Sequence, residues 1–376
     1  MKVLLYTNIA TPYRKYLYDL LYKEFKEDGD EFKVFIMAPT EKNRSWLFND
    51  YKSEYMKLLE GTTYTIGGTY IHYNYNLKKE LLSYSPDIVI GSGSYLYPGI
   101  WLLTSLKNRC GYKLYFWNES HLSEKRNYGS LKLKIRELIR NIFFQKIDAF
   151  IYAGENAKKF ILNYYKGRFE GILMPNIVDP RIYLRKQIGY KKEEYLHNKT
   201  VFFCPARLSP VKGLSEFMDL LALTKNKDSA LVLVAGEGEL LSVLQEKAKN
   251  LNLNFVFLGY KNINEVAELY HKSDIFLLPS LSDPNPLSCI EALWAGLPLL
   301  VSNYVGNYPE VVKQGCNGYM FNYNNKAEAV KLIDEIISSD EKWRNEASKV
   351  SLSIAYEHFN PQKVAQYVRD EIKKNM

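Results

Sequence analysis

Two carboxylates lie close together in the C-terminal half of the chain. Asp283 is in a proline-rich loop, and Glu291 follows eight residues later. The apolar run Ile275–Leu278 before the loop and the run Leu299–Ser302 after Glu291 are each typical of a buried strand. A short helix between them predicts a βαβ unit. The N-terminus of that helix would open at the carboxyl end of a strand, where free backbone N–H groups favour an anion.

The helix itself explains why Glu291 needs a partner. Asn285 suits the N-cap, Pro286 suits the first helical position, and Gly296 is expected to end the helix. An ionised glutamate in an otherwise apolar helix requires hydrogen-bond donors, and sugar or ribose hydroxyls would serve. The alternative is that Glu291 only complements the helix dipole.

Cations precede this unit. The strand-like run Val201–Pro205 leads into a turn that carries Arg207 and Lys212 before the helical pattern Leu214–Leu223. Placed at the carboxyl end of another strand, these two side chains could clamp a diphosphate without a metal ion.

Two further strand-like runs end in glycine. Leu231–Ala235 runs into Gly236 and Gly238, and the next run ends at Gly259, followed by Tyr260. Each glycine is by itself a weak signal, because an ordinary βα turn has the same composition.

Taken in order, these residues resemble a known family. The pattern is similar to the C-terminal half of retaining glycosyltransferases of family 4, the glycosyl transferases group 1, and extends over roughly residues 201–321. The family usually has Glu followed by Pro-Phe-Gly, where this chain has Asp283 followed by Pro-Asn-Pro. The residues that carry the resemblance are Arg207, Lys212, Gly236, Gly238, Gly259, Asp283, Glu291, Gly306, Glu310, Asn317 and Gly318.

The resemblance implies an α/β protein with the GT-B fold, in which two Rossmann-like doubly wound domains face each other across a cleft. We expect an N-terminal acceptor-binding domain at 1–185, a nucleotide-sugar-binding domain at 195–360, and a C-terminal helix at 361–376 that crosses back to the first domain. The N-terminal half supports this with its own alternating pattern, whose candidate strands are Lys2–Tyr6, Phe32–Met37, Ile88–Gly91, Lys113–Trp117, Ala149–Tyr152 and Gly171–Met174.

Composition is consistent with this organisation. The chain has 376 residues, of which 47% are hydrophobic, and no apolar run approaches the roughly 20 residues of a spanning helix. Residues 1–6 read as a strand and not as a signal peptide. We therefore expect a cytoplasmic protein, at the inner face of the membrane if its acceptor is lipid-linked. The scattered cysteines, Cys110, Cys204, Cys289 and Cys316, are expected to be reduced core thiols, and neither they nor the histidines predict a metal site.

The positive charge is concentrated in one region. Residues 101–200 contain 20 Lys and Arg against 9 Asp and Glu, whereas the whole chain carries a net charge of +8. Within this region, 130–146 has the pattern of a basic amphipathic helix. One interpretation is a helix with one face in the core and its basic residues in solvent. The other is peripheral contact with an anionic membrane. No nucleic-acid-binding signature is present.

Candidate acceptor residues lie in the N-terminal half. Thr11 and Arg14 open a helix after the first strand, in a variant of the family's first turn, although Arg14 could equally be an ordinary surface residue. Glu119 and His121 follow the strand that ends at Trp117. By resemblance, His121 faces the donor hexose. Glu119 is either an acceptor-site residue or the partner of a neighbouring loop.

The resemblance implies transfer of a sugar from a UDP- or GDP-sugar to a glycan or polyprenyl-linked saccharide, with retained configuration, in surface polysaccharide biosynthesis. No cofactor or metal is expected. Asp283 would hold a hexose hydroxyl or the developing oxocarbenium ion, and Glu291 the ribose. The base would lie near Gly259 and Tyr260, and the diphosphate among Arg207, Lys212, Leu287 and Ser288. Gly236 is expected to be a further residue of the donor site.

Two alternatives remain at this point. A GT-B phosphorylase or epimerase would act on the same donor, and a phosphorylase would depend on free phosphate. A non-catalytic sugar-nucleotide-binding protein would bind donor without turnover, as the departure at Asp283 would permit.

Overall fold

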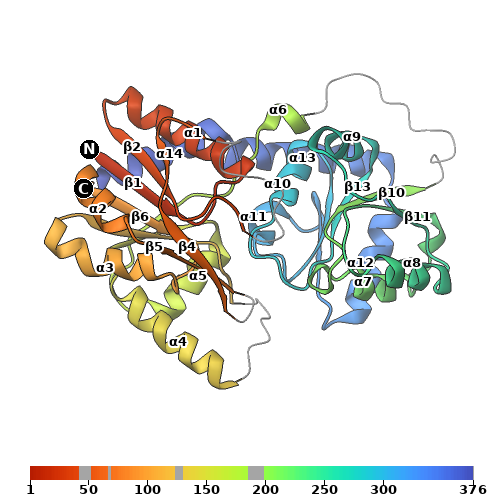
Figure 1. The fold of residues 1–376 in the computed structure, drawn as a ribbon. Helices are drawn as coiled ribbons and strands as arrows, with labels where there is room; N and C mark the ends of the chain where they lie inside the picture. Colours follow the sequence, from red (N-terminus) through yellow and green to blue (C-terminus); the bar gives the residue numbers. More distant parts are fainter. Residues whose placement is uncertain (42–51, 67–68, 123–129, 185–198, 376) are drawn as a thin grey trace. The chain divides into compact units, whose positions relative to one another are not determined.

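The computed structural model describes residues 1–41, 52–66, 69–122, 130–184 and 199–375, and these form two compact units (Figure 1). Of the described residues, the first unit contains 1–119, 130–177 and the C-terminal residues from Pro361. The second contains Val178–Asn360 together with the short stretch that begins at Ser120.

The first unit is built on a parallel seven-stranded sheet of order β3-β2-β1-β6-β7-β8-β9. Val3 and Leu5 face one core and Leu4 and Tyr6 the other, because alternate residues of a strand point to opposite faces. The strands are β1 (Lys2–Thr7), β2 (Glu31–Ile36), β3 (Met56–Leu58), β6 (Ile88–Ser92), β7 (Lys113–Asn118), β8 (Ala149–Tyr152) and β9 (Gly171–Leu173).

Helices cover both faces of this sheet. The core on one face is completed by α1 (Pro12–Glu27) and α14 (Pro361–Lys374). The core on the other face is completed by α2 (Leu77–Tyr84), α3 (Pro98–Cys110), α4 (Ser130–Phe144) and α5 (Glu155–Tyr164). A separate antiparallel hairpin, β4 (Gly61–Ile66) and β5 (Thr69–Asn74), lies beside α3.

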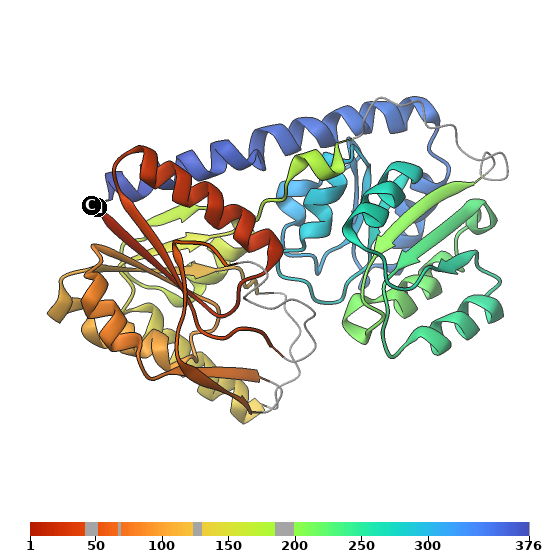
Figure 2. The same ribbon diagram turned by 45° about the horizontal axis from the view of Figure 1, so that its top comes forward.

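The C-terminal helix is part of the first unit. Figure 2 shows α14 lying along α1, and an ion pair of 3.0 Å joins Arg369 Nη1 to Glu24 Oε2 across this contact. Lys373 adds contacts of 2.9 Å to Asp28 and Asp30. The apolar side of α14, which includes Val368 and Ile372, completes the core on this face of the sheet.

The second unit repeats the design with a parallel six-stranded sheet of order β12-β11-β10-β13-β14-β15. Its strands are β10 (Thr200–Pro205), β11 (Ala230–Ala235), β12 (Phe255–Phe257), β13 (Ile275–Leu278), β14 (Leu299–Ser302) and β15 (Gly318–Phe321). One face packs against α7 (Leu214–Leu221), α8 (Leu241–Asn250) and α12 (Lys326–Ile337). The other packs against α6 (Pro180–Tyr183), α9 (Ile263–Lys272), α10 (Leu287–Trp294), α11 (Tyr308–Val311) and α13 (Glu341–His358).

Both units are therefore Rossmann-like and doubly wound, which confirms the predicted fold class. The strands expected from the sequence are present within a residue or two of their predicted ends. Two expectations are wrong in detail. The N-cap of α10 is Pro286 and not Asn285, because Pro286 still has extended dihedral angles of −68° and 125°. Cys316 is exposed and Cys110 is half-buried, so only Cys204 and Cys289 are core thiols.

Other elements lie where the sequence made no prediction. Strand β3 and the β4–β5 hairpin have no counterpart among the expected strands. The two units divide between Ile177 and Val178, ahead of residue 185, where the sequence analysis ends the first domain, because Val178 and Tyr183 pack into a core of the second unit.

Candidate functional site

The strand order of the second unit identifies the edge at which a ligand would bind. β10 lies between β11 and β13, so the direction of winding reverses between β10 and β13. In open α/β sheets, ligands bind at the carboxyl ends of the strands beside such a switch point. The loop after β10 carries Arg207 and Lys212, and the loop after β13 carries Asp283. Sheet topology thus brings together residues about 70 positions apart, and the structure confirms this for one pair, whose separation is 71.

Lys212 and Asp283 form an ion pair, with 2.5 Å between Nζ and Oδ2. Lys212 ends the short 3₁₀ helix Pro210–Lys212, and the next residue, Gly213, has a φ of 65°. A Cβ at Gly213 would lie 2.1 Å from the carbonyl oxygen of Pro279, so only glycine permits this close approach. The Leu281 amide also donates to the Val211 carbonyl at 2.8 Å, which ties the two loops together.

A second loop supports Asp283 from the other side. The Gly306 amide donates to the Asp283 carbonyl at 2.7 Å, and the Asp283 amide donates to the Tyr304 carbonyl at 3.2 Å. A Cβ at Gly306 would lie 1.8 Å from the Pro284 carbonyl oxygen and 2.9 Å from Cδ2 of His121. His121, which is buried, therefore lies against Gly306, in the loop that supports Asp283.

Glycines also bring the loops after β10, β11 and β12 together. The Gly236 amide donates to the Gly259 carbonyl at 2.8 Å, and the Leu208 amide donates to the Glu237 carbonyl at 2.9 Å. A Cβ at Gly236 or Gly238 would lie 2.2 Å from a carbonyl oxygen of the β10 loop. The structure thus gives the glycines a structural role in joining these loops.

Tyr260 and Arg207 belong to the same loops, and both are exposed. Within the described part of the chain, Arg207 forms no ion pair, so its charge is available to a ligand.

Helix α10 opens directly after the Asp283 loop. Its N-cap, Pro286, provides no side-chain cap, and the first amides of a helix have no partner within it. Leu287 and Ser288 are the first two helical residues, and both are half-buried. The helix start can therefore offer N–H donors and a favourable dipole to an anion, as the sequence predicts.

Glu291, one turn further along α10, has two partners that the sequence did not reveal. Tyr183 Oη donates to Oε1 at 2.9 Å, and Tyr270 Oη donates to Oε2 at 2.9 Å. Burial raises the pKa of the Glu291 carboxyl above its ordinary value, and the hydroxyls of Tyr270 and Tyr183 act in the opposite direction. Glu291 is thus oriented by side chains of the protein, and the interpretation that it only complements the helix dipole is insufficient.

Two of the predicted acceptor residues of the first unit, Arg14 and Glu119, form a partly buried ion pair. Arg14 Nη2 lies 3.0 Å from Glu119 Oε2, and its guanidinium stacks over the Trp117 ring with 4.7 Å to the centroid. Burial by itself would lower the pKa of Arg14, but Glu119 and nearby tyrosines raise it above its ordinary value. Arg14 is thus an inward-facing ion-pair partner and not a surface residue. Thr11 is also buried, at the N-cap of α1.

One side of α4 is apolar and exposed. Ile135, Leu138 and Ile142, spaced three and four residues apart, have exposed fractions of 50%, 61% and 47%. The apolar inner contacts of α4 are made by Phe143 and Phe144 at its last turn. Arg140 also faces inward, where its guanidinium lies 4.6–5.1 Å from the ring centroids of Tyr95, Phe160 and Tyr164. The interpretation that α4 places its apolar face in the core is therefore correct only for the last turn. We call Ile135, Leu138 and Ile142 the α4 stripe.

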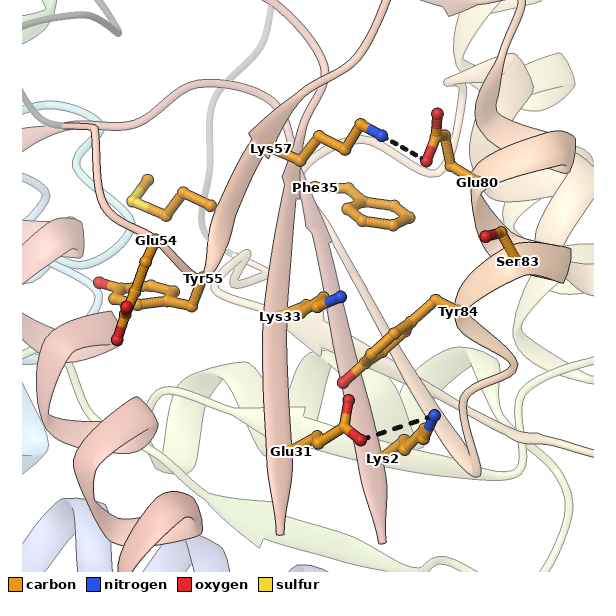
Figure 3. A pocket seen from close by; sticks show the side chains of 11 residues that line it. Lys2, Glu31, Lys33, Phe35, Glu54, Tyr55, Lys57, Glu80, Ser83 and Tyr84 are labelled. Carbon is orange, nitrogen blue, oxygen red and sulfur yellow. Dashed lines mark hydrogen bonds and ion pairs between the residues drawn. The ribbon is translucent and has the colours of Figure 1, made fainter.

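A pocket of about 410 Å³ lies elsewhere in the first unit, between the first three strands and α2 (Figure 3). Its charges are largely matched within the protein. Lys57 pairs with Glu80 at 2.5 Å, Lys2 pairs with Glu31 at 3.6 Å, and Lys33 lies over the Tyr84 ring. None of the predicted site residues lines this pocket, and it lies away from the carboxyl ends of the strands.

Two further findings concern the part of the chain that the structure describes. It contains no helix that is both long and apolar enough to cross a membrane. It also contains no group of three or more His, Cys, Asp or Glu side chains arranged to hold a metal ion.

Comparison with known proteins places this site in a family domain. Residues 188–350 match the model of the glycosyl transferases group 1 family. The chain is 27% identical to an N-acetyl-alpha-D-glucosaminyl L-malate synthase of Bacillus anthracis, over 51% of each chain. It is 31% identical to a UDP-Gal:alpha-D-GlcNAc-diphosphoundecaprenol alpha-1,3-galactosyltransferase of Escherichia coli, over 48% of each. The chain spans about half the length of these curated relatives.

Solved structures agree over the whole chain. Anabaena HepE in complex with UDP and glucose has a TM-score of 0.72 at 16% identity, and both chains are covered completely. The lipopolysaccharide outer core galactosyltransferase WaaB has a TM-score of 0.73 at 14% identity, again with complete coverage of both chains. At such identities the likeness establishes the fold alone. The chain has the GT-B fold. The candidate site of its second unit lies among the residues that are similar to the glycosyl transferases group 1 model.

Proposed function

We propose that the protein is a glycosyltransferase that moves a sugar from a nucleoside-diphosphate sugar to a glycan or lipid-linked saccharide. The observation that carries this proposal is the geometry of the second unit. An anion-favouring helix start, a lysine, a carboxylate in contact with that lysine, and an oriented glutamate all follow the strands beside one switch point. All of them lie within the residues that match the family domain.

Each residue has a proposed task. The diphosphate binds to Arg207, Lys212 and the amides at the start of α10, and Glu291 accepts hydrogen bonds from the ribose. When the bond between the sugar's anomeric carbon and the diphosphate breaks, its electron pair stays on the diphosphate. Positive charge held there stabilises this leaving group. No metal ion is part of the proposal, and turnover is expected to persist in EDTA.

The sugar end of the donor is assigned to the Asp283 loop. Asp283 would hold a hexose hydroxyl or the positive charge that develops on the ring, while the acceptor hydroxyl forms the new bond to the anomeric carbon and its proton passes to the departing diphosphate. His121 would face the hexose, and its contact with the Gly306 loop supports a place near Asp283. Retention of configuration is proposed from the resemblance to family 4.

The acceptor side of the proposal rests on the first unit and on relatives. Arg14 and Glu119 form an ion pair near the carboxyl ends of β1 and β7, which are separated only by β6, and Thr11 is the N-cap residue of α1, the helix that carries Arg14. The E. coli relative is named for an acceptor on diphosphoundecaprenol. We therefore propose a polyprenyl-linked or glycan acceptor in surface polysaccharide assembly. We also propose a cytoplasmic location at the inner face of an anionic membrane, which the α4 stripe would contact.

A donor screen tests the proposal. The protein is incubated with UDP-, GDP- and ADP-sugars and a pool of lipid-linked acceptors, with Glu291→Ala and Lys212→Ala in parallel. Mass spectrometry detects transfer and NMR reads the anomeric configuration. Transfer from one donor with retention, lost in both variants, is expected. Donor binding without transfer or hydrolysis would instead identify a binding protein, and turnover that requires free phosphate would identify a phosphorylase.

A further inference from the structure

The carboxylate of Glu291 is held by two tyrosine hydroxyls that come from separate helices. Tyr183 lies on α6 and binds Oε1, and Tyr270 lies on α9 and binds Oε2, both at 2.9 Å. The two tyrosines are buried almost completely, with exposed fractions of 3% and 0%. Among the described residues, each oxygen of Glu291 thus accepts one side-chain hydrogen bond.

Hydrogen-bond capacity sets what this carboxylate can still accept. An ionised carboxylate offers about four lone-pair positions, two on each oxygen. The two tyrosines occupy one position on each oxygen, so one position remains on each. Two hydroxyl donors on adjacent carbons, as in the 2′,3′-diol of a ribonucleoside, can fill both remaining positions.

Packing and hydrogen bonds hold both tyrosines in place. The Tyr183 ring meets the Tyr270 ring edge-on at 5.8 Å, and the Tyr270 ring meets the Phe203 ring edge-on at 4.9 Å. His271 Nε2 donates to the Tyr183 carbonyl at 2.7 Å, which fixes the backbone of α6 to α9. Asp179 caps α6 by accepting from the Arg181 amide at 3.0 Å. The Tyr270 hydroxyl also lies 3.1 Å from the Ser288 carbonyl oxygen, so its single proton is shared between that oxygen and Glu291 Oε2. Both hydroxyls are therefore held beside the Glu291 carboxylate.

Tyr183 lies on the first helix after the junction between the two units. The chain passes from the first unit to the second between Ile177 and Val178, and α6 is the first helix after that point. α6 packs against α9 and α10. Glu291 is thus one hydrogen bond away from the helix that follows the junction between the two units.

We propose that Tyr183 and Tyr270 are positioning residues for Glu291. They orient the carboxylate toward a vicinal diol. Through Tyr183, a nucleotide that binds to Glu291 also stabilises the backbone hydrogen bonds of α6. This inference rests on the proposed function, because it assumes a ribonucleoside diphosphate sugar as the ligand. It adds to that function two residues, a preference for ribose over 2′-deoxyribose, and a link to the joining segment.

Calorimetric titration of free nucleotides tests the positioning role. UDP, GDP and ADP are titrated first, and the tightest of these is then compared with its 2′-deoxy form. Tyr183→Phe and Tyr270→Phe are expected to weaken the ribonucleotide roughly tenfold and to affect the 2′-deoxy form much less, so that the preference for ribose shrinks. The control is Tyr356→Phe on α13, a half-exposed tyrosine whose ring packs edge-on against Trp294 at 4.8 Å.

The outcomes separate this inference from the proposed function. If the wild-type protein binds none of the nucleotides, the proposed function itself is wrong. If the wild-type protein prefers ribose and both variants keep that preference, the tyrosines only support packing and the positioning role is overturned.

A measurement on the wild-type protein needs no variant that could fail to fold. The Ile182 amide donates to the Asp179 carbonyl at 3.2 Å, and the Leu184 amide donates to the Pro180 carbonyl at 2.8 Å. We expect the ribonucleotide to slow hydrogen exchange at these two amides more than the 2′-deoxy form does at equal saturation. Equal slowing by both forms, or none, would overturn the link to α6.

Discussion

Lys212 Nζ lies 2.5 Å from Asp283 Oδ2, so a cation and a carboxylate that the sequence assigns to different tasks form one ion pair. Their side chains are 23% and 14% exposed, so the pair is partly shielded from water. A diphosphate that approaches Lys212 must therefore share its ammonium group with Asp283. The negative charge of Asp283 lowers the attraction of the site for an anion, while it holds the lysine in position for one.

Substitution of either partner should separate these two effects. Lys212→Met leaves Asp283 without its cation next to the ligand, and we expect binding of the free nucleoside diphosphate to weaken by at least about tenfold. Asp283→Asn removes a repelling charge, so the same nucleotide should bind at least as tightly as it binds the wild type. Sugar transfer by Asp283→Asn should nevertheless fall about a hundredfold or more, because the developing positive charge loses its partner. Calorimetry and initial rates measure the two quantities. Equal losses of binding in both variants would mean that the pair serves structure alone.

Gly306 should be intolerant of any side chain. A Cβ at this position would lie 1.8 Å from the Pro284 carbonyl oxygen, so Gly306→Ala must displace the loop that holds Asp283. We expect a loss of stability of about 1–3 kcal/mol and a much larger loss of transfer than of nucleotide binding. Gly315→Ala is the matched control. Its φ is 75° and its Cβ would meet nothing within 4 Å, so it tests backbone strain without collision. Urea unfolding and initial rates give the comparison. Normal transfer by Gly306→Ala would show that the loop geometry is unimportant.

Much of the fold and part of the site follow from local patterns. The runs Ile275–Leu278 and Leu299–Ser302 are the observed strands β13 and β14, because continuous apolar stretches bounded by turns are typical of parallel strands buried on both faces. The position of the start of α10 follows from Pro286 and from the loop between the two apolar runs, and a helix that starts at the carboxyl end of a strand favours an anion. The contact between Lys212 and Asp283 requires one further fact, that β10 and β13 are neighbours, which the family resemblance supplies but the residues alone do not.

Other features depend on contacts that no local pattern encodes. Tyr183 is 108 residues from Glu291, and nothing in its surroundings distinguishes it among the 31 tyrosines of the chain. The β4–β5 hairpin was not predicted because every residue of β4 is exposed, so its sequence lacks the alternation of a half-buried strand. The pattern of α4 predicts an amphipathic helix, but periodicity does not say whether a neighbour covers the apolar side.

Nucleotide binding should weaken toward acid pH because of Glu291. Burial raises the pKa of this carboxyl, and a protonated Glu291 accepts ribose hydroxyls poorly. Affinity should be full above the raised pKa and fall as the pH drops through it, at a higher pH than an ordinary glutamate would give. Tyr183→Phe should move this midpoint further up, because its hydroxyl lowers the pKa of Glu291. Calorimetry across pH measures the midpoint. Glu291→Gln removes this titration and leaves Asp283 and Lys212 in place, so a drop of equal size in that variant would assign the effect to another group.

The ion pair between Arg14 and Glu119 should stabilise the first unit. Arg14→Ala leaves a partly buried carboxylate unpaired and removes the stacking on Trp117, so we expect a loss of about 2–4 kcal/mol. The double variant with Glu119→Ala should lose less than the sum of the single losses. Arg168→Ala, at an exposed position in the same unit, should change stability by less than about 0.5 kcal/mol. Urea unfolding of the wild type and of each variant measures these differences in the free energy of unfolding. An Arg14→Ala variant that is as stable as the wild type, but impaired with acceptor, would make Arg14 an acceptor residue only.

The α4 stripe should bind anionic membranes. An apolar face that is exposed on a helix with basic neighbours such as Lys134 combines the two forces that hold a helix in a bilayer interface. Co-sedimentation with vesicles of phosphatidylglycerol and phosphatidylcholine measures the binding. Leu138→Ser should reduce it about tenfold, because one large apolar side chain no longer enters the lipid. Leu162→Ser is the control, since Leu162 lies on α5 of the same unit and is also exposed, at 44% against 61% for Leu138. Binding should also weaken with added salt and without the anionic lipid, because the basic residues act through charge. Equal losses in the two variants, or equal binding to neutral vesicles, would show that the stripe does not mediate membrane contact.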